Sequence, residues 1–156
     1  MGSKREAPIA LDLARLEDVP CLADLLGLLF AQEAEFAPDR EKQRRALRTI
    51  ISDASLGRVY VARDGADPVA MASLLYTVST AAGGKAAWLE DMVVRPDRRG
   101  RGIGRALLEH VAVQARADGV LRITLLTDPD NERAHALYRS LGFESSAMYP
   151  MRLKLD

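Results

Sequence analysis

The segment that decides the fold is Val93-Val94-Arg95-Pro96-Asp97-Arg98-Arg99-Gly100-Arg101-Gly102-Ile103-Gly104-Arg105. Its three glycines stand at alternate positions, directly before an apolar helical pattern that runs to Asp118. Glycine leaves the neighbouring N–H groups unshielded, and the following helix adds the positive end of its dipole. Five arginines and one acid lie between residues 95 and 105. We therefore expect this turn to bind a diphosphate; the alternative is a tight strand-to-helix turn with arginines at the surface.

Two other phosphate-binding motifs do not fit the same segment. A Walker A loop requires Gly-Lys-Ser or Gly-Lys-Thr, whereas Gly104 is followed by Arg105-Ala106. The dinucleotide fingerprint requires G-x-G-x-x-G directly after a strand, whereas residues 96–99 separate this turn from the preceding strand pattern. A P-loop NTPase and a Rossmann module are therefore disfavoured.

The motif Arg99-Gly100-Arg101-Gly102-Ile103-Gly104 resembles the R/Q-x-x-G-x-G/A signature of the GNAT superfamily, the acetyl-CoA-dependent N-acetyltransferases. Three further segments resemble the same family, namely Leu89-Glu90-Asp91-Met92-Val93-Val94-Arg95-Pro96, Asn131-Glu132-Arg133-Ala134 and Tyr138-Arg139-Ser140-Leu141-Gly142-Phe143. The resemblance is strongest over residues 86–145 and weak over residues 1–55.

Hydrophobic periodicity and turn residues predict an alternation of strands and helices around this motif. The expected strands cover 9–13, 59–62, 69–78, 88–94, 121–127 and 149–155, with 121–127 buried and 149–155 closing the chain. The expected helices cover 18–30, 40–54, the stretch from the glycine turn to 118, and 131–141. The resemblance implies an α/β fold of the GNAT type: a central, mixed, mostly antiparallel twisted sheet, flanked by about four helices and splayed between strands 88–94 and 121–127.

Length and composition are typical of one globular domain. The chain has 156 residues, 48% of them hydrophobic and 28% charged. We expect residues 8–156 to form a single acetyltransferase domain and residues 1–7 to be a disordered leader or an expression remnant. Apolar residues 19–31 are too few to span a bilayer and are interrupted by Asp24.

Net charge, cysteine and histidine content argue against several kinds of partner and site. The 22 basic and 22 acidic residues balance, so no overall field favours nucleic acid or an anionic membrane. The single cysteine, Cys21, excludes an internal disulfide and a thiolate metal cluster, and is expected to be a buried small hydrophobe. His110 and His135 have no partners at ligand spacing, so no metal is expected. These features favour a cytoplasmic protein.

Glu90 and Asp91 are the candidate bases. Acetyl transfer to an amine requires a proton acceptor, because an alkylammonium has a pKa of about 10.4. Strand alternation places Glu90 with Trp88, Met92 and Val94, and Asp91 with Leu89 and Val93, so both carboxylates are expected among apolar neighbours that raise the pKa. The resemblance favours Glu90 as base or water-positioning residue, with Asp91 in reserve. The alternative is that they accept backbone hydrogen bonds or pair with an arginine.

Tyr138 shares a helical stripe with apolar residues, so periodicity alone indicates a core aromatic. The resemblance instead makes its hydroxyl the donor that protonates the departing CoA thiolate. Asn131 is expected to cap the helix and to bind the pantetheine arm.

The remaining site residues follow from the resemblance. Backbone groups of the strand around residues 92–94 would bind the pantetheine amides, and the glycine turn would bind the diphosphate. The cofactor-binding set is Met92, Val93, Val94, Arg99, Gly100, Arg101, Gly102, Ile103, Gly104, Arg105, Asn131 and Tyr138.

The function that the resemblance implies is transfer of an acetyl group from acetyl-CoA to a primary amine by direct attack in a ternary complex. An acyl-CoA-binding sensor or interaction module without turnover is the alternative, and a nucleotide-binding module of another fold is a third reading. The acceptor, a small molecule or a peptide, is not identified by the sequence, and a homodimer is left open.

Overall fold

The structure is a computed structural model that describes residues 8–33 and 35–155. The expected leader at residues 1–7 lies outside the described residues. Two compact units make up the chain, residues 1–126 and residues 127–156.

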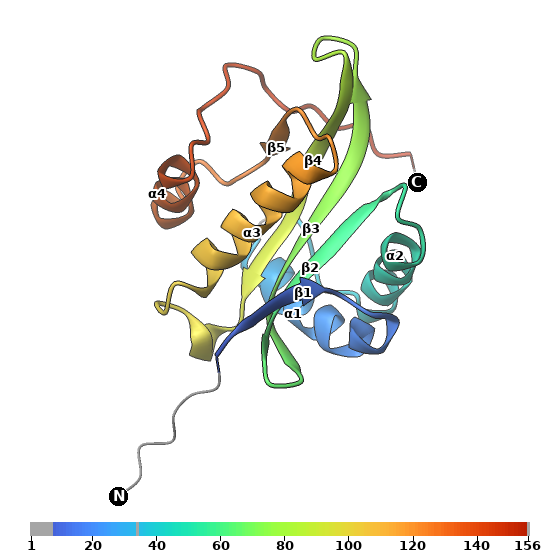
Figure 1. Cartoon of the computed structure of the whole chain (residues 1–156), viewed down its shortest axis with the longest axis vertical. Helices are drawn as coiled ribbons and strands as arrows, with labels where there is room; N and C mark the ends of the chain where they lie inside the picture. Colours follow the sequence, from blue (N-terminus) through green and yellow to red (C-terminus); the bar gives the residue numbers. More distant parts are fainter. Residues whose placement is uncertain (1–7, 34, 156) are drawn as a thin grey trace, which may run out of the picture. The chain divides into compact units, whose positions relative to one another are not determined.

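The first unit is built on a five-stranded sheet in the order β1-β2-β3-β4-β5. The first four strands pair antiparallel, and β5 runs parallel to β4 (Figure 1). The strands are β1 Ala10–Leu13, β2 Gly57–Asp64, β3 Asp67–Ser79, β4 Gly84–Val94 and β5 Ile123–Leu125. The predicted mixed, mostly antiparallel sheet is confirmed.

Within residues 8–33 and 35–155, three α-helices belong to the first unit and one to the second, in agreement with the expected four. They are α1 Val19–Gln32, α2 Arg40–Ser52, α3 Ile103–Ala117 and, in the second unit, α4 Glu132–Ser140. Short 3-10 turns, Leu16–Asp18 and Pro96–Arg98, precede α1 and the glycine turn.

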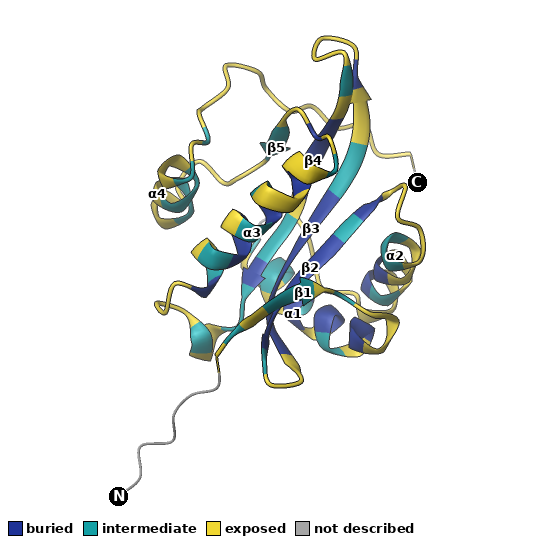
Figure 2. Ribbon diagram, in the orientation of Figure 1, coloured by how far each residue is buried: buried dark blue, intermediate teal, exposed yellow. Residues whose placement is uncertain are grey.

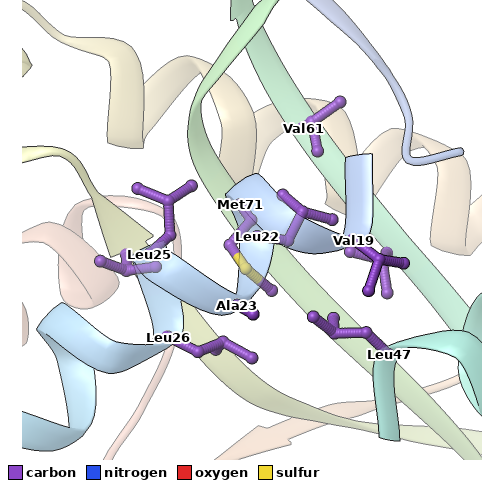
Figure 3. Close-up of a cluster of buried hydrophobic side chains, with 10 residues drawn as sticks. Val19, Leu22, Ala23, Leu25, Leu26, Leu47, Val61 and Met71 are labelled. Carbon is purple, nitrogen blue, oxygen red and sulfur yellow. The ribbon is translucent and has the colours of Figure 1, made fainter. Parts of the chain in front are cut away.

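Helices α1 and α2 cover one face of the sheet (Figure 1). Leucines of α1 recur at helical spacing, so they form one apolar stripe that packs onto the strands. Leu22, Leu47 of α2, Val61 and Met71 are all essentially buried in this cluster (Figure 3).

Helix α3 lies across the other face. Leu107 and Val111 are buried against the sheet, whereas the outward residues of α3 are exposed (Figure 2). Tyr60 points to this face and meets the His110 ring edge-on, with ring centroids 5.8 Å apart. His110 therefore has a packing contact in the core.

A buried ion pair fixes the start of α1 to β2. Arg63 donates to both carboxylate oxygens of Asp18, Nη1 to Oδ1 at 2.8 Å and Nη2 to Oδ2 at 2.7 Å. Asp18 is 6% exposed and Arg63 is 7% exposed. The Arg63 hydrogen bond holds the pKa of Asp18 below its usual value, although burial opposes this shift.

Two predicted strands differ from the structure. The strand expected to be buried at 121–127 has only three paired residues, none of them buried, because β5 bonds to β4 alone within the described sheet. No strand forms over 149–155, where Tyr149 is 93% and Leu155 is 91% exposed. Alternating apolar residues favour a strand, but a strand also needs a hydrogen-bonded neighbour, and this segment has none in the described chain.

Candidate functional site

A β-bulge interrupts β4 at the candidate carboxylates. Leu74 of β3 pairs with Leu89, and the next residue, Ser73, pairs with Asp91, so Glu90 is the extra residue. The bulge reverses the alternation of side chains between Leu89 and Asp91. The predicted face shared by Asp91 and Leu89 is therefore wrong: by register, Leu89 faces the α3 side of the sheet and Asp91 the α1 side.

The bulge also divides the predicted set of Trp88, Met92 and Val94. Trp88 pairs with Leu75, on the face of Ser73 and Asp91, whereas Met92 pairs with Ala72 on the opposite face. Glu90 itself is exposed, so the expected apolar surroundings do not apply to this residue.

Strands β4 and β5 part beside the bulge. Their pairing covers residues 87–89 of β4 and ends at Leu89, although β4 continues to Val94. Residues 90–94 therefore have no strand partner on the β5 side within the described part of this unit. The predicted splay between these strands is confirmed, and its open edge carries Met92, Val93 and Val94.

Asp91 is held by a neutral hydrogen-bond partner. Ser73 Oγ donates to Asp91 Oδ2 at 2.7 Å and accepts from the Asp91 backbone N–H at 3.1 Å. Desolvation by burial raises the pKa of Asp91 to about 6; the Ser73 hydrogen bond opposes this shift and the charge of Glu90 adds to it. The bulge thus contains a carboxylate that changes charge close to neutral pH.

The glycine turn leads into α3 without a side-chain cap. Gly100 and Gly102 have φ angles of 75° and 76°, in the left-handed region that favours glycine. Gly102 is the N-cap residue, and the first helical bond runs from the N–H of Ala106 to its carbonyl. The N–H groups of residues 103–105 precede that bond, and the space beside both glycines is open. This arrangement fits an anionic group.

Several arginines of the turn have partners within the chain. Arg95 Nε lies 2.6 Å from Asp97 Oδ1, Arg98 pairs with Asp64, and Arg105 pairs with Glu109. Arg99 Nε donates to the carbonyl of Val94 at 2.9 Å. The positive charge that the sequence places here is therefore partly neutralised, and the backbone N–H groups carry more of the anion-binding potential.

The second unit contains the other two candidates. Asn131 caps α4, as predicted, by accepting the N–H of Ala134 at 3.2 Å. The half-buried Tyr138 ring meets Phe143 at 5.7 Å between centroids and 60° between planes. Desolvation raises the pKa of Tyr138, so its hydroxyl stays protonated at neutral pH.

A sequence model described as the Acetyltransferase (GNAT) family matches residues 23–143. The chain belongs to this family.

Curated GNAT relatives match parts of the chain. A mycothiol acetyltransferase of Beutenbergia cavernae is 36% identical over 91 residues, which cover 58% of this chain and 30% of that protein. A [ribosomal protein bS18]-alanine N-acetyltransferase of Salmonella typhimurium is 40% identical over 62 residues, covering 40% of this chain and 42% of that protein. The matches thus span less than half the length of these relatives.

Solved structures share this fold over nearly the whole chain. An integron cassette protein from the Cole Harbour salt marsh metagenome superposes with a TM-score of 0.81 at 29% identity, covering 94% of this chain and 90% of that one. A possible acetyltransferase of Clostridium difficile 630 gives a TM-score of 0.84 at 19% identity, covering 95% and 98%.

The structure also bears on the expectations for Cys21, for metal ligands and for membrane-spanning helices. Cys21 is partly buried, its Sγ lies 3.5 Å from the carbonyl of Pro68, and burial raises the pKa of its thiol. Residues 8–33 and 35–155 contain no group of three His, Cys, Asp or Glu side chains placed to hold a metal. None of the helices described is long and apolar enough to cross a membrane.

Ser73 is the residue of this site that the sequence analysis missed. It is the only polar residue in the run Val69-Ala70-Met71-Ala72-Ser73-Leu74-Leu75 and is 1% exposed. A polar side chain inside a buried strand requires a hydrogen-bond partner, and this signal was available in the sequence. Its partner could not be read from the sequence, because it depends on the register of the bulge.

Proposed function

We propose that this protein transfers the acetyl group of acetyl-CoA to a primary amine by direct attack in a ternary complex. The observation that carries the proposal is the Asp91 carboxylate, which lies in the bulge where β4 and β5 part and has its pKa raised to about 6. Membership in the GNAT family supports the same reaction.

Asp91 is the proposed base. An amine attacks only in its neutral form, and an acceptor with a pKa near the working pH removes the ammonium proton most effectively. Burial brings Asp91 into that range, whereas Glu90 is exposed at the apex of the bulge. We assign Glu90 to the approach of the amine or of a bridging water.

Acetyl-CoA would supply the reactive thioester. The open edge of β4 at residues 92–94 has the geometry to receive an extended amide chain as an added strand, and the first-turn N–H groups of α3 would bind the diphosphate. A backbone N–H near Met92 would stabilise negative charge on the thioester oxygen.

Tyr138 and Asn131 are assigned by the family resemblance. The Tyr138 hydroxyl, protonated at neutral pH, would donate to the departing thiolate. The Asn131 side chain caps α4, and its remaining donors would bind the pantetheine arm.

The acceptor is proposed as a small-molecule or peptide amine. The names of the relatives include a ribosomal-protein alanine and thialysine as acceptors, so both kinds occur within the matches. A cytoplasmic location and a homodimer belong to the same proposal.

The test is amine-dependent release of CoA thiol from acetyl-CoA across polyamines, amino acids, aminoglycosides and lysine peptides. We expect saturable release with one amine class and a loss of about 10²–10⁴-fold in kcat/KM for Asp91→Asn. Asp53→Asn, a change in an exposed carboxylate at the end of α2, is the matched control.

Two outcomes contradict the proposal. Acetyl-CoA binding without turnover of any amine favours the sensor alternative. Displacement of acetyl-CoA by ATP or NAD at lower concentration than by CoA favours the nucleotide-binding module.

A further inference from the structure

The Ser73 hydroxyl makes two hydrogen bonds to the same residue across the bulge. It accepts the backbone N–H of Asp91 at 3.1 Å and donates to Asp91 Oδ2 at 2.7 Å. A hydroxyl carries one proton, so donation to the carboxylate fixes the direction of the chain from N–H through Oγ–H to Oδ2. This closed arrangement restrains the side-chain rotamer of Asp91.

Ser73 stabilises the charged form of Asp91, whereas the neighbouring charge of Glu90 destabilises it. Glu90 is the charged group that acts on Asp91, and it opposes ionisation. The shift of Asp91 has no contribution from the other ionisable groups described on β4, β3, α1 and α3: Lys85, Asp67, Tyr76, Cys21, Asp24, Arg105, Glu109, His110 and Arg116. Of the causes that set the pKa of Asp91, the Ser73 hydrogen bond is the one that favours the charged form.

We propose that Ser73 is a positioning residue for Asp91, whose hydroxyl fixes the orientation of the carboxylate in the bulge and favours its ionised form. Its importance for acetyl transfer rests on the proposed function, in which Asp91 is the base. The hydroxyl cannot act on substrate through its proton, because that proton is already donated to Asp91.

The first experiment titrates Asp91 directly and needs neither acetyl-CoA nor an amine. Protein with ¹³C-labelled aspartate is followed by NMR of the side-chain carboxyl carbon between pH 3 and 8, and Asp91→Asn assigns the signal. We expect Ser73→Ala to raise the midpoint of Asp91 by about one pH unit, because a hydrogen bond to the charged form is lost. Ser73→Thr, which keeps the hydroxyl, should restore the wild-type midpoint.

A second serine on the same strand provides the matched control. Ser79 is also buried, and its Oγ accepts the N–H of Ala82 in the β3–β4 turn, away from the bulge. Ser79→Ala should leave the Asp91 midpoint unchanged. If Ser73→Ala does not fold, Ser73→Cys, which replaces the hydroxyl by a somewhat larger thiol that is a weaker donor, gives the same test.

The second experiment measures kcat/KM against pH with acetyl-CoA and whichever polyamine or lysine peptide is turned over. In Ser73→Ala the acidic limb should move upward with the NMR midpoint, while KM for acetyl-CoA changes less than twofold.

The two readouts separate the possible failures. A folded Ser73→Ala protein with an unchanged midpoint overturns the positioning role. If Ser73→Ala raises the NMR midpoint of Asp91 but does not shift the acidic limb of the kcat/KM profile, Ser73 still positions Asp91, and Asp91 is not the base.

Discussion

Two aspartates of the sheet unit are withdrawn from solvent in opposite electrostatic settings. Asp18, at the start of α1, receives a bidentate hydrogen bond from Arg63, and its pKa is lowered. Asp91, in the β4 bulge, receives a single hydroxyl from Ser73, and its pKa rises to about 6. The Asp18 site therefore keeps its carboxylate ionised at neutral pH, whereas the Asp91 carboxylate can gain or lose a proton close to neutral pH.

Removing the cation from the first site should have the largest effect on stability. Arg63→Met leaves the Asp18 carboxylate buried without its partner, and we expect a loss of about 4 kcal/mol and of roughly 10 °C in Tm. Thermal unfolding at pH 7 measures this. Arg15→Met is the control, because the Arg15 side chain is exposed and its pairs with Asp12 and Glu17 should contribute under about 1 kcal/mol. Equal losses in the two variants would contradict the distinction between the sites.

The second prediction compares Asn substitutions at the two aspartates. Asp91 binds its proton more tightly in the folded than in the unfolded chain, so the folded state loses stability as pH rises from about 4 to about 6. Asp91→Asn should therefore stabilise the protein by about 2 kcal/mol at pH 7 and by nearly nothing at pH 4.

Asp18→Asn should behave in the opposite way. The lowered pKa of Asp18 contributes stability above the unfolded value of about 3.9, and this is lost as pH falls through the folded value. The variant should be less stable than wild type at pH 7 and approach it in acid. Urea unfolding at several pH values measures both differences, and a shared sign at pH 7 would refute the comparison.

The smallest expected effect concerns Glu90. Its charge raises the pKa of Asp91, so Glu90→Gln should lower the NMR midpoint of Asp91 by about 0.5 pH unit. Because Glu90 is exposed, the difference from wild type should shrink in 1 M salt. A rise of the midpoint in this variant would contradict the repulsion.

Local sequence patterns predicted most of the fold. Helix periodicity and the Asn131 cap act over a few residues, and the structure has both. Gly119 and Gly142, both at positive φ, follow the last turns of α3 and α4. The strand predicted at 149–155 is absent because a local pattern cannot supply a neighbouring strand. The alternation of apolar residues is present there, but a strand also needs a hydrogen-bonded partner from elsewhere in the chain.

The candidate site was predictable in part. The carboxylates and the glycine turn stand out in the sequence, but a one-residue bulge decides which face Asp91 occupies. The ion-pair partners of the turn arginines could not be predicted from the sequence either, since Asp64 lies 34 positions before Arg98 in the chain. Cross-strand register and long-range ion pairs are properties of the assembled sheet.

The sheet also has a consequence for the order of folding. Two loop residues join β2 to β3 and four join β3 to β4, so the three central strands close with little loss of chain entropy, whereas β5 joins only after the whole of α3. The Ser73–Asp91 contact spans 18 residues within the second hairpin. The bulge therefore belongs to the part of the chain expected to assemble first, and a core substitution there should slow folding more than one in β5.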